Sequence, residues 1–365
     1  MKANGTLSFR MFYVPRPWPQ DAIRRFADHA MPPIDTLGDG TIHGWVTGRH
    51  ALDRNINDDT AVFGGYPLLQ LVQAERKVPP ALLAAEIRIE ELAQMAARGD
   101  DRLASSVRRD IRKQVLDRLQ THAQPTLKGI PFVYDPRNEL IYAAAMSDAQ
   151  VDTFQIHFAQ TIGFSLIPVT PDMVAIKRAQ CNVRDLDPCT FSPECDYTEV
   201  APGAGLDFLM WLWFVAEARG GRLQISDVGD IDVMIEGPLV FVGKGGGAHQ
   251  IGLKNGQPML ASETKAALLA GKKLRRAKVT LAHGEDIYSF TLDAIPFAFR
   301  SLKLPDGEKK LDPISRFQDR MDKLDFFQRS FLGFYDRFLA ERRDHKRWSA
   351  TIAEIHTWAT SRRAR

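Results

Sequence analysis

Alternating apolar and polar residues predict a series of short β-strands along most of the chain. Clear examples are residues 6–13, 41–47, 67–77 and 287–292. Alternation with a period of two turns one face of a strand toward the core and the other toward solvent. The predicted strands follow one another through tight turns, with helices inserted singly or in pairs. This order favours an α+β fold with antiparallel sheets over a doubly wound parallel sheet.

Two consecutive helices are predicted within residues 79–119. The first repeats apolar residues at steps of three and four, and the second repeats them at steps of four, as amphipathic helices do. The two apolar stripes are Leu82, Ala85, Ile89, Leu92 and Ala96 in the first helix, and Leu103, Val107, Ile111, Val115 and Leu119 in the second. We therefore expect a helical pair inside an N-terminal α+β region.

Two further segments carry apolar helical patterns. Residues 208–216 are strongly apolar but far shorter than the roughly 20 residues of a membrane span, and they predict a buried helix. Residues 311–343 predict a long helix with phenylalanine at helical spacing, which is typical of a core or a helix-packing seam. The alternative to a core or packing role is that Phe327, Phe331 and Phe334 dock a partner protein. The chain would then be an assembly protein that does not act on nucleic acid.

Composition divides the chain into four parts. Residues 1–182 predict an N-terminal α+β region, and residues 206–305 predict a C-terminal α+β region. Residues 183–205 are rich in Pro, Asp, Cys and Gly and predict a linker between the two. Residues 306–365 predict a helical tail.

Positive charge is concentrated in residues 262–281, although the whole chain has a formal net charge of only +3. A predicted short helix runs there into a strand, and Glu263 is the only acid. The basic residues are Lys265, Lys272, Lys273, Arg275, Arg276 and Lys278. A strand with one buried and one electropositive face suits a polyanion, of which nucleic acid is the commonest. The alternative is a solvated edge strand that lysines protect against pairing.

Other basic residues extend the predicted DNA-binding surface. They are Arg108, Arg109, Arg112 and Lys113 in the second helix of the pair, and Lys128 and Lys254 beside predicted turns. In the helix they are spaced four apart and lie mostly off the apolar stripe, so they form a second basic face. The alternative for this helix is an ordinary solvated surface.

The sequence offers no convincing catalytic constellation. Asp230, Asp232 and Glu236 alternate on one face of a predicted strand, and clustered carboxylates can hold the metal ions of a nuclease. The simpler interpretation is the solvent-facing side of that strand. We therefore expect no enzymatic activity, no metal and no cofactor, and keep a metal-dependent exonuclease as an alternative.

The three cysteines, Cys181, Cys189 and Cys195, lie in one polar segment. They form no CxxC pair and have no nearby histidine, so we expect no zinc site. An odd number of cysteines, and an N-terminus without a continuous apolar core, predict a cytoplasmic protein.

The order of these features resembles the bacterial recombination-associated protein RdgC family. The similarity runs from about residue 6 to residue 305. It is carried by the opening strand at residues 6–14, HGWV at residues 43–46, the helical pair, the hairpin at residues 132–147 and the basic helix–strand unit at residues 262–281.

The resemblance implies a protein that binds double-stranded DNA without sequence preference and closes around it as a ring-shaped homodimer. It also implies an effect on RecA-dependent recombination or replication, and a location at the nucleoid in the cytoplasm. His122 and Gln124 stand where the family tends to have an Arg and a Phe at the gate of the ring, so the gate is not carried over to this chain.

Overall fold

The computed structural model describes residues 5–37, 40–99, 101–196, 200–244, 249–307 and 311–362, and the side chain of His122 lies outside the described part. The fold is α+β, as predicted, with a 13-stranded antiparallel sheet. Its longest path runs β10-β9-β11-β12-β13-β1-β6-β5-β4-β2. The strands are β1 (Leu7–Tyr13), β2 (Thr41–Thr47), β3 (Val62–Phe63), β4 (Tyr66–Arg76), β5 (Pro125–Asp135), β6 (Leu140–Ala143), β7 (Ile167–Pro168), β8 (Arg222–Ile225), β9 (Gly229–Val242), β10 (Gln250–Leu253), β11 (Lys273–His283), β12 (Asp286–Asp293) and β13 (Ala298–Lys303). The helices are α1 (Ala22–Asp28), α2 (Asp58–Ala61), α3 (Pro80–Arg98), α4 (Ser105–His122), α5 (Asp148–Ile162), α6 (Pro171–Ala179), α7 (Ala204–Ala218), α8 (Ser262–Leu269), α9 (Pro313–Arg343) and α10 (His345–Ser361).

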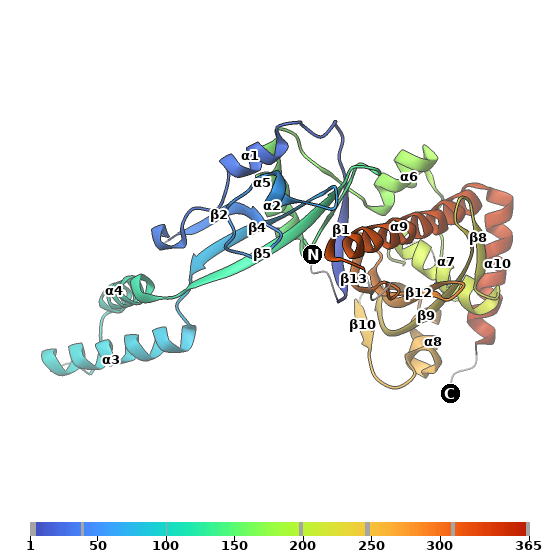
Figure 1. The fold of residues 1–365 in the computed structure, drawn as a ribbon. Coiled ribbons are helices and arrows are strands. Elements are labelled where there is room, and N and C mark those ends of the chain that lie inside the picture. The colour runs from blue at the N-terminus through green and yellow to red at the C-terminus, as the bar shows by residue number, and fades with distance from the viewer. Residues whose placement is uncertain are drawn as a thin grey trace.

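Strand β1 joins the two halves of the sheet. It pairs with β13 on one side and with β6 on the other. The sheet therefore continues from an N-terminal half, which contains β2 to β7, into a C-terminal half, which contains β8 to β13. The molecule has the shape of an arch in which α3 and α4 form one foot and the C-terminal half forms the other (Figure 1).

The core of the C-terminal half lies between the sheet and the helices α7 and α9. Helix α7 is buried along most of its length, as its apolar sequence predicts. Helix α9 turns its aromatic side toward the sheet, where the ring of Phe299 lies 5.3 Å from that of Phe327 and 4.8 Å from that of Phe331. Helix α10 packs beside them, with Trp358 at 5.0 Å from Trp213 of α7.

The aromatic residues of α9 do not form a docking surface. Phe327, Phe331 and Phe334 expose 0%, 2% and 1% of their surfaces. They are buried because the sheet and α7 cover the side of α9 on which they lie. The alternative in which these three residues dock a partner is therefore wrong.

The N-terminal half has a second core, beneath α1 and α5. Phe26 of α1 and Phe154 of α5 pack with Trp45 and Phe132 of the sheet. Helix α5 begins at a capping box, in which Ser147 accepts from the backbone N–H of Gln150 and the Gln150 side chain accepts from the N–H of Ser147. This cap fixes the start of α5 at the junction of the two halves.

Helices α3 and α4 form a hairpin at the ends of the long strands β4 and β5 (Figure 1). Its core does not contain the predicted stripe of the first helix, since Leu82, Ile89 and Leu92 are 45%, 62% and 49% exposed. A second apolar row faces α4 instead, because α3 is apolar on two sides. The residues between the helices are Leu83, Ile87, Met95, Leu103, Val107, Ile111, Val115 and Leu119.

The predicted linker is partly built into the fold. Within residues 183–205, Cys189 and Phe191 belong to the core of the C-terminal half. The described residues of the predicted helical tail, in α9 and α10, contribute to the same core. Both segments therefore help to hold the C-terminal half together.

Candidate nucleic-acid interface

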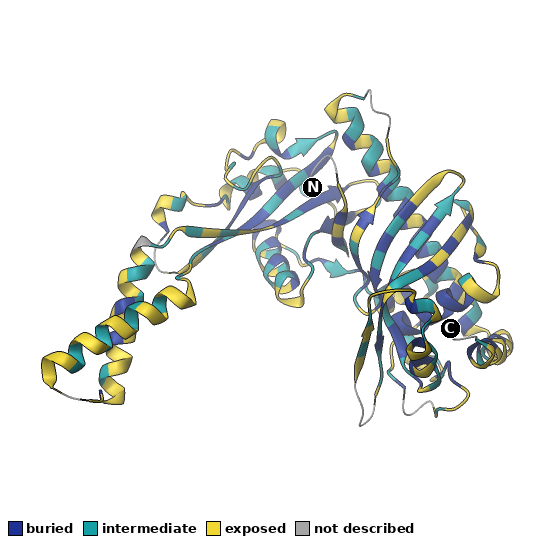
Figure 2. Cartoon of the chain, turned by 90° about the horizontal axis from the view of Figure 1, so that it is seen from below, coloured by how far each residue is buried: buried dark blue, intermediate teal, exposed yellow. Residues whose placement is uncertain are grey.

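The C-terminal half of the sheet has one covered face and one open face. Along β9, β11 and β12, residues such as Ile235, Val279 and Phe290 are buried beneath the helices. Their neighbours Lys278, Thr280 and Thr291 point the other way and remain partly exposed. In the view from below, these strands lie in front of the helices, so the open face is on the inner side of the arch (Figure 2).

Strand register arranges cations and hydroxyl groups in rows across the open face. Lys278 of β11 lies opposite Thr291 of β12, which in turn lies opposite Arg300 of β13. In the next row, Thr280 lies opposite Ser289, and Ser289 opposite Lys303. Lysine, arginine and hydroxyl groups at neighbouring positions are the side chains that usually contact phosphate oxygens.

Most of the predicted basic cluster does not lie free on this face. The helix–strand unit forms as α8 and β11, but Lys273 is buried and its Nζ lies 2.5 Å from Asp207. Arg275 and Arg276 lie 3.3 and 2.6 Å from the buried carboxylate of Asp293.

The remaining members of the cluster are Lys265, Lys272 and Lys278. Lys278 lies 2.8 Å from Glu236 across the strands. Lys265 and Lys272 are half-buried. The prediction of one continuous electropositive face is therefore wrong for Lys273, because its side chain is buried in an ion pair with Asp207 of α7.

The predicted basic face of α4 is exposed. Arg108, Arg109, Arg112 and Lys113 all reach solvent, and no ion pair joins them to another described residue. Their charges are therefore available to a polyanion at the foot of the arch that α3 and α4 form, which we call the arm.

The two predicted cations beside turns have different surroundings. Lys128 of β5 lies 3.1 Å from Glu75 of β4, and this hydrogen bond lowers the pKa of the Glu75 carboxyl. Lys254 follows β10 and is exposed.

Sequence reasoning missed Arg10, Arg300 and Lys303. These residues stand singly in the chain, and only the pairing of β1 and β12 with β13 brings them to the open face. For Arg300 and Lys303 the sequence did contain a signal, because polar side chains alternate with apolar ones in residues 289–303.

The predicted acidic residues do not form one cluster, because two of them pair with different basic residues. Asp232 lies 2.7 Å from Arg222, which lowers the pKa of its carboxyl through a hydrogen bond, and Glu236 faces Lys278. Within the described ranges, no group of three or more His, Cys, Asp or Glu side chains is arranged to hold a metal ion. Asp230 is exposed on the same strand.

The three cysteines are free thiols, and Cys189 has the most distinctive surroundings. Its Sγ lies 3.4 Å from Oδ2 of Asp207, beside the Lys273 ion pair and a cavity of about 710 Å³. Burial, and then the charge of Asp207, raise the pKa of this thiol. Cys189 is therefore protonated at neutral pH, which does not suit a nucleophile.

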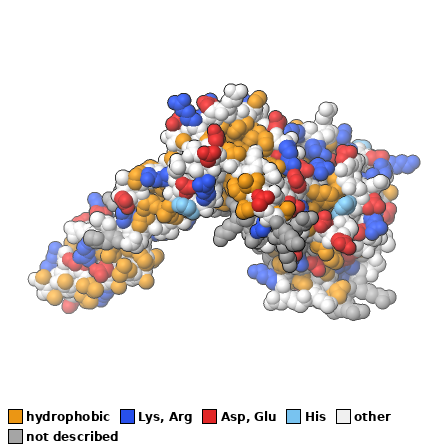
Figure 3. Space-filling view, in the orientation of Figure 1, with side chains coloured by type: hydrophobic (Ala, Val, Ile, Leu, Met, Phe, Trp, Pro, Cys, Tyr) orange, Lys and Arg blue, Asp and Glu red, His pale blue; other side chains and the backbone are white. Residues whose placement is uncertain are grey.

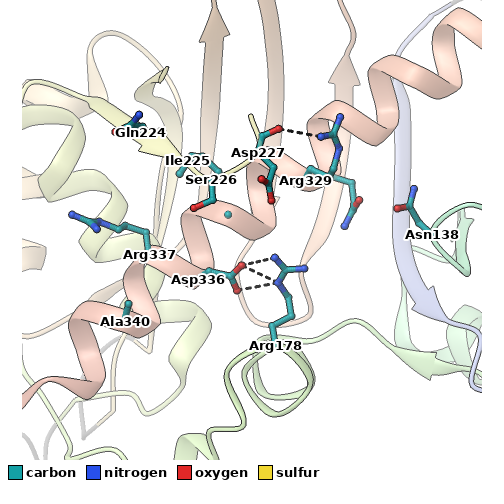
Figure 4. Close-up of a pocket in the computed structure, with 12 residues that line it drawn as sticks. Asn138, Arg178, Gln224, Ile225, Ser226, Asp227, Arg329, Asp336, Arg337 and Ala340 are labelled. Atoms are coloured by element: carbon teal, nitrogen blue, oxygen red, sulfur yellow. Dashed lines mark hydrogen bonds and ion pairs between the residues drawn. The ribbon is translucent and has the colours of Figure 1, made fainter. Parts of the chain in front are cut away.

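A polar cavity of about 500 Å³ lies on the covered side of the sheet (Figure 4). It is bordered by α9, by the turn between β8 and β9, and by Arg178 of α6. Arg178 donates from Nε and Nη2 to the carboxylate of Asp336 at 2.5 to 3.0 Å, and Arg329 donates to the backbone oxygen of Asp227 at 3.3 Å. Arg178 is paired with Asp336 and Arg329 with Asp325, so neither guanidinium group is left without a carboxylate partner.

No protein-family model matches the sequence, and the search of curated proteins found no match. Among the described helices, none is both long enough and apolar enough to span a bilayer. The fold and the candidate interface are thus those of an α+β arch with an open, hydroxyl- and cation-bearing sheet face on its inner side.

Proposed function

We propose that this protein binds double-stranded DNA without sequence preference, as a ring-shaped homodimer. The open face carries the proposal, because Lys278, Arg300 and Lys303 stand there among serine and threonine hydroxyl groups. Such groups contact phosphates, which are the same at every base pair, and so they do not read sequence.

The shape of the chain supports a protein that encloses its ligand. A hollow separates the arm from the C-terminal half on the underside of the arch (Figure 3). The open face borders this hollow. Two arches that met foot to foot would surround an opening with open faces on its inside.

The exposed stripe of α3 supports self-association. Leu82, Ile89 and Leu92 lie at helical spacing on a projecting arm, and each is at least 45% exposed. Fully burying such a side chain is worth about 1.5–3 kcal/mol. An exposed apolar helix face marks an interaction site, and we propose a second copy of this chain as the partner.

The basic face of α4 would provide a second contact with DNA. It lies on the same arm as the apolar stripe, but on the neighbouring helix. In a dimer closed through α3, Arg108 and Arg112 would line the opening or its rim. Closure would add the contacts of two subunits, which compensates for the modest net charge of each.

A protein of this kind acts on DNA rather than on a small molecule. It would associate with the nucleoid in the cytoplasm and compete with a RecA-type recombinase for the same duplex. It would restrain strand exchange by occupying the duplex, without changing the DNA chemically.

The test is fluorescence anisotropy with two duplexes of equal length and unrelated sequence, titrated across salt with and without Mg²⁺ or Mn²⁺. We expect equal affinities that fall steeply as salt rises, and intact duplexes afterwards. Absence of binding, or a strong preference for one sequence, would contradict the proposal. Degradation that depends on the metal would favour the exonuclease instead.

A further inference from the structure

Two arginines converge at the junction between the open face and α5. Arg10 of β1 and Arg300 of β13 lie on neighbouring strands. Both donate to the same acceptor, the backbone oxygen of Met146, at 3.4 and 3.3 Å. Met146 directly precedes Ser147, the N-cap of α5.

The charges at this junction are not balanced. One carboxylate, that of Asp148, lies 2.9 Å from Arg10, and no described carboxylate forms an ion pair with Arg300. The Nε atoms of Arg10 and Arg300 are buried without a hydrogen-bond acceptor among the described residues. The two guanidinium groups share one carbonyl oxygen and one carboxylate, so their surplus positive charge favours an additional anion.

The ion pair between Asp148 and Arg10 is weak. Its side chain is 90% exposed, whereas that of Arg10 is 14% exposed. A carboxylate in water gains about 0–1 kcal/mol from such a pair. It can therefore leave the guanidinium group of Arg10 when a better ligand arrives.

We infer that Arg10 and Arg300 form a binding site for one backbone phosphate of DNA, and that the carboxylate of Asp148 occupies the place of that phosphate in the free protein. This inference rests on the proposed DNA-binding function and specifies one contact within it. Displacing Asp148 exchanges one anion for another on the same donors.

A phosphate fits this position better than a carboxylate does. Its additional oxygens can accept from both guanidinium groups, whereas Asp148 reaches only Arg10. The start of α5 also favours an anion, since helix N-termini carry a partial positive charge.

The test compares Asp148→Asn with the wild type in DNA titrations across salt. Removing the competing carboxylate should tighten binding about five- to tenfold at 0.1 M salt and steepen the salt slope by about 0.9. The matched control is Asp152→Asn, since Asp152 is an exposed acid one turn further along α5. An equal gain in both variants would show a general charge effect and overturn the inference.

A double variant tests whether the gain acts through the arginines. In an Arg10→Gln/Arg300→Gln background, Asp148→Asn should change neither affinity nor slope. A gain that persisted there would also overturn the inference, with thermal melts confirming that each variant is folded. If the wild type retained no DNA, the proposed function itself would fail. If the wild type bound and Asp148→Asn behaved like Asp152→Asn, only the inference would fail.

Discussion

Lys273 and Lys303 stand on strands of the same half-sheet, yet their surroundings differ. Lys273 is buried against Asp207, whereas Lys303 is exposed on the open face. A buried cation must be paired to be tolerated, so Lys273 belongs to the structure of the core. An exposed cation without a carboxylate partner is free to meet a phosphate. The partner of each side chain, more than its charge, decides its role.

Replacing Lys273 should therefore affect stability and not DNA binding. Lys273→Met leaves Asp207 as an unpaired buried charge and should lower the free energy of unfolding by about 3–5 kcal/mol. The double variant Lys273→Met/Asp207→Leu should recover most of this loss, as measured by urea denaturation. If the double variant is folded but binds DNA more weakly, Lys273 contributes to DNA binding and the prediction is contradicted.

The surroundings of Cys189 predict low reactivity. Burial and the neighbouring Asp207 raise the pKa of its thiol, so little thiolate forms at pH 8. We expect Cys189 to resist thiol reagents in the folded protein and to react in urea, where its pKa returns to about 8.5. Mass spectrometry of the labelled peptides measures this, and rapid labelling of folded Cys189 would contradict it.

At the scale of elements, the sequence indicates most helices and strands but not what each face contacts. The pattern of α3 predicts a helix, and one forms. Two apolar rows compete for the contact with α4, however, and spacing alone does not identify the buried one. The same limit applies to β11, where the pattern predicts the strand but not that Lys273 is buried against Asp207 of α7.

The exposed apolar stripe of α3 provides a test of the dimer. A charge within the exposed stripe should prevent self-association, because closing the interface would then bury an unpaired carboxylate. We expect light scattering to give a mass near twice 41.0 kDa for the wild type and near 41.0 kDa for Ile89→Glu. The control is Ile156→Glu, since Ile156 is an isoleucine of similar exposure on α5, 56% against 62% for Ile89. A wild-type mass of one chain would contradict the ring.

At the scale of the whole molecule, function depends on a surface that no single segment carries. Arg10 is near the beginning of the chain and Lys303 ends its last strand, and the pairing of β1 with β13 brings the two segments side by side. Composition reveals only a net charge of +3, which gives little indication of such a surface. The class of fold could be predicted from the sequence, whereas the open face depends on register and on which side the helices cover.

The central claim is that the open face binds DNA through its phosphates. The most direct test measures the anisotropy of labelled duplexes across salt for the variant Arg300→Gln/Lys303→Gln. The control is Arg337→Gln, since Arg337 is exposed on α9, which covers the opposite face. We predict that the double variant binds every duplex more weakly by the same factor, with a salt slope smaller by about two units, while the control matches the wild type. An unchanged affinity and slope in the double variant would contradict the account.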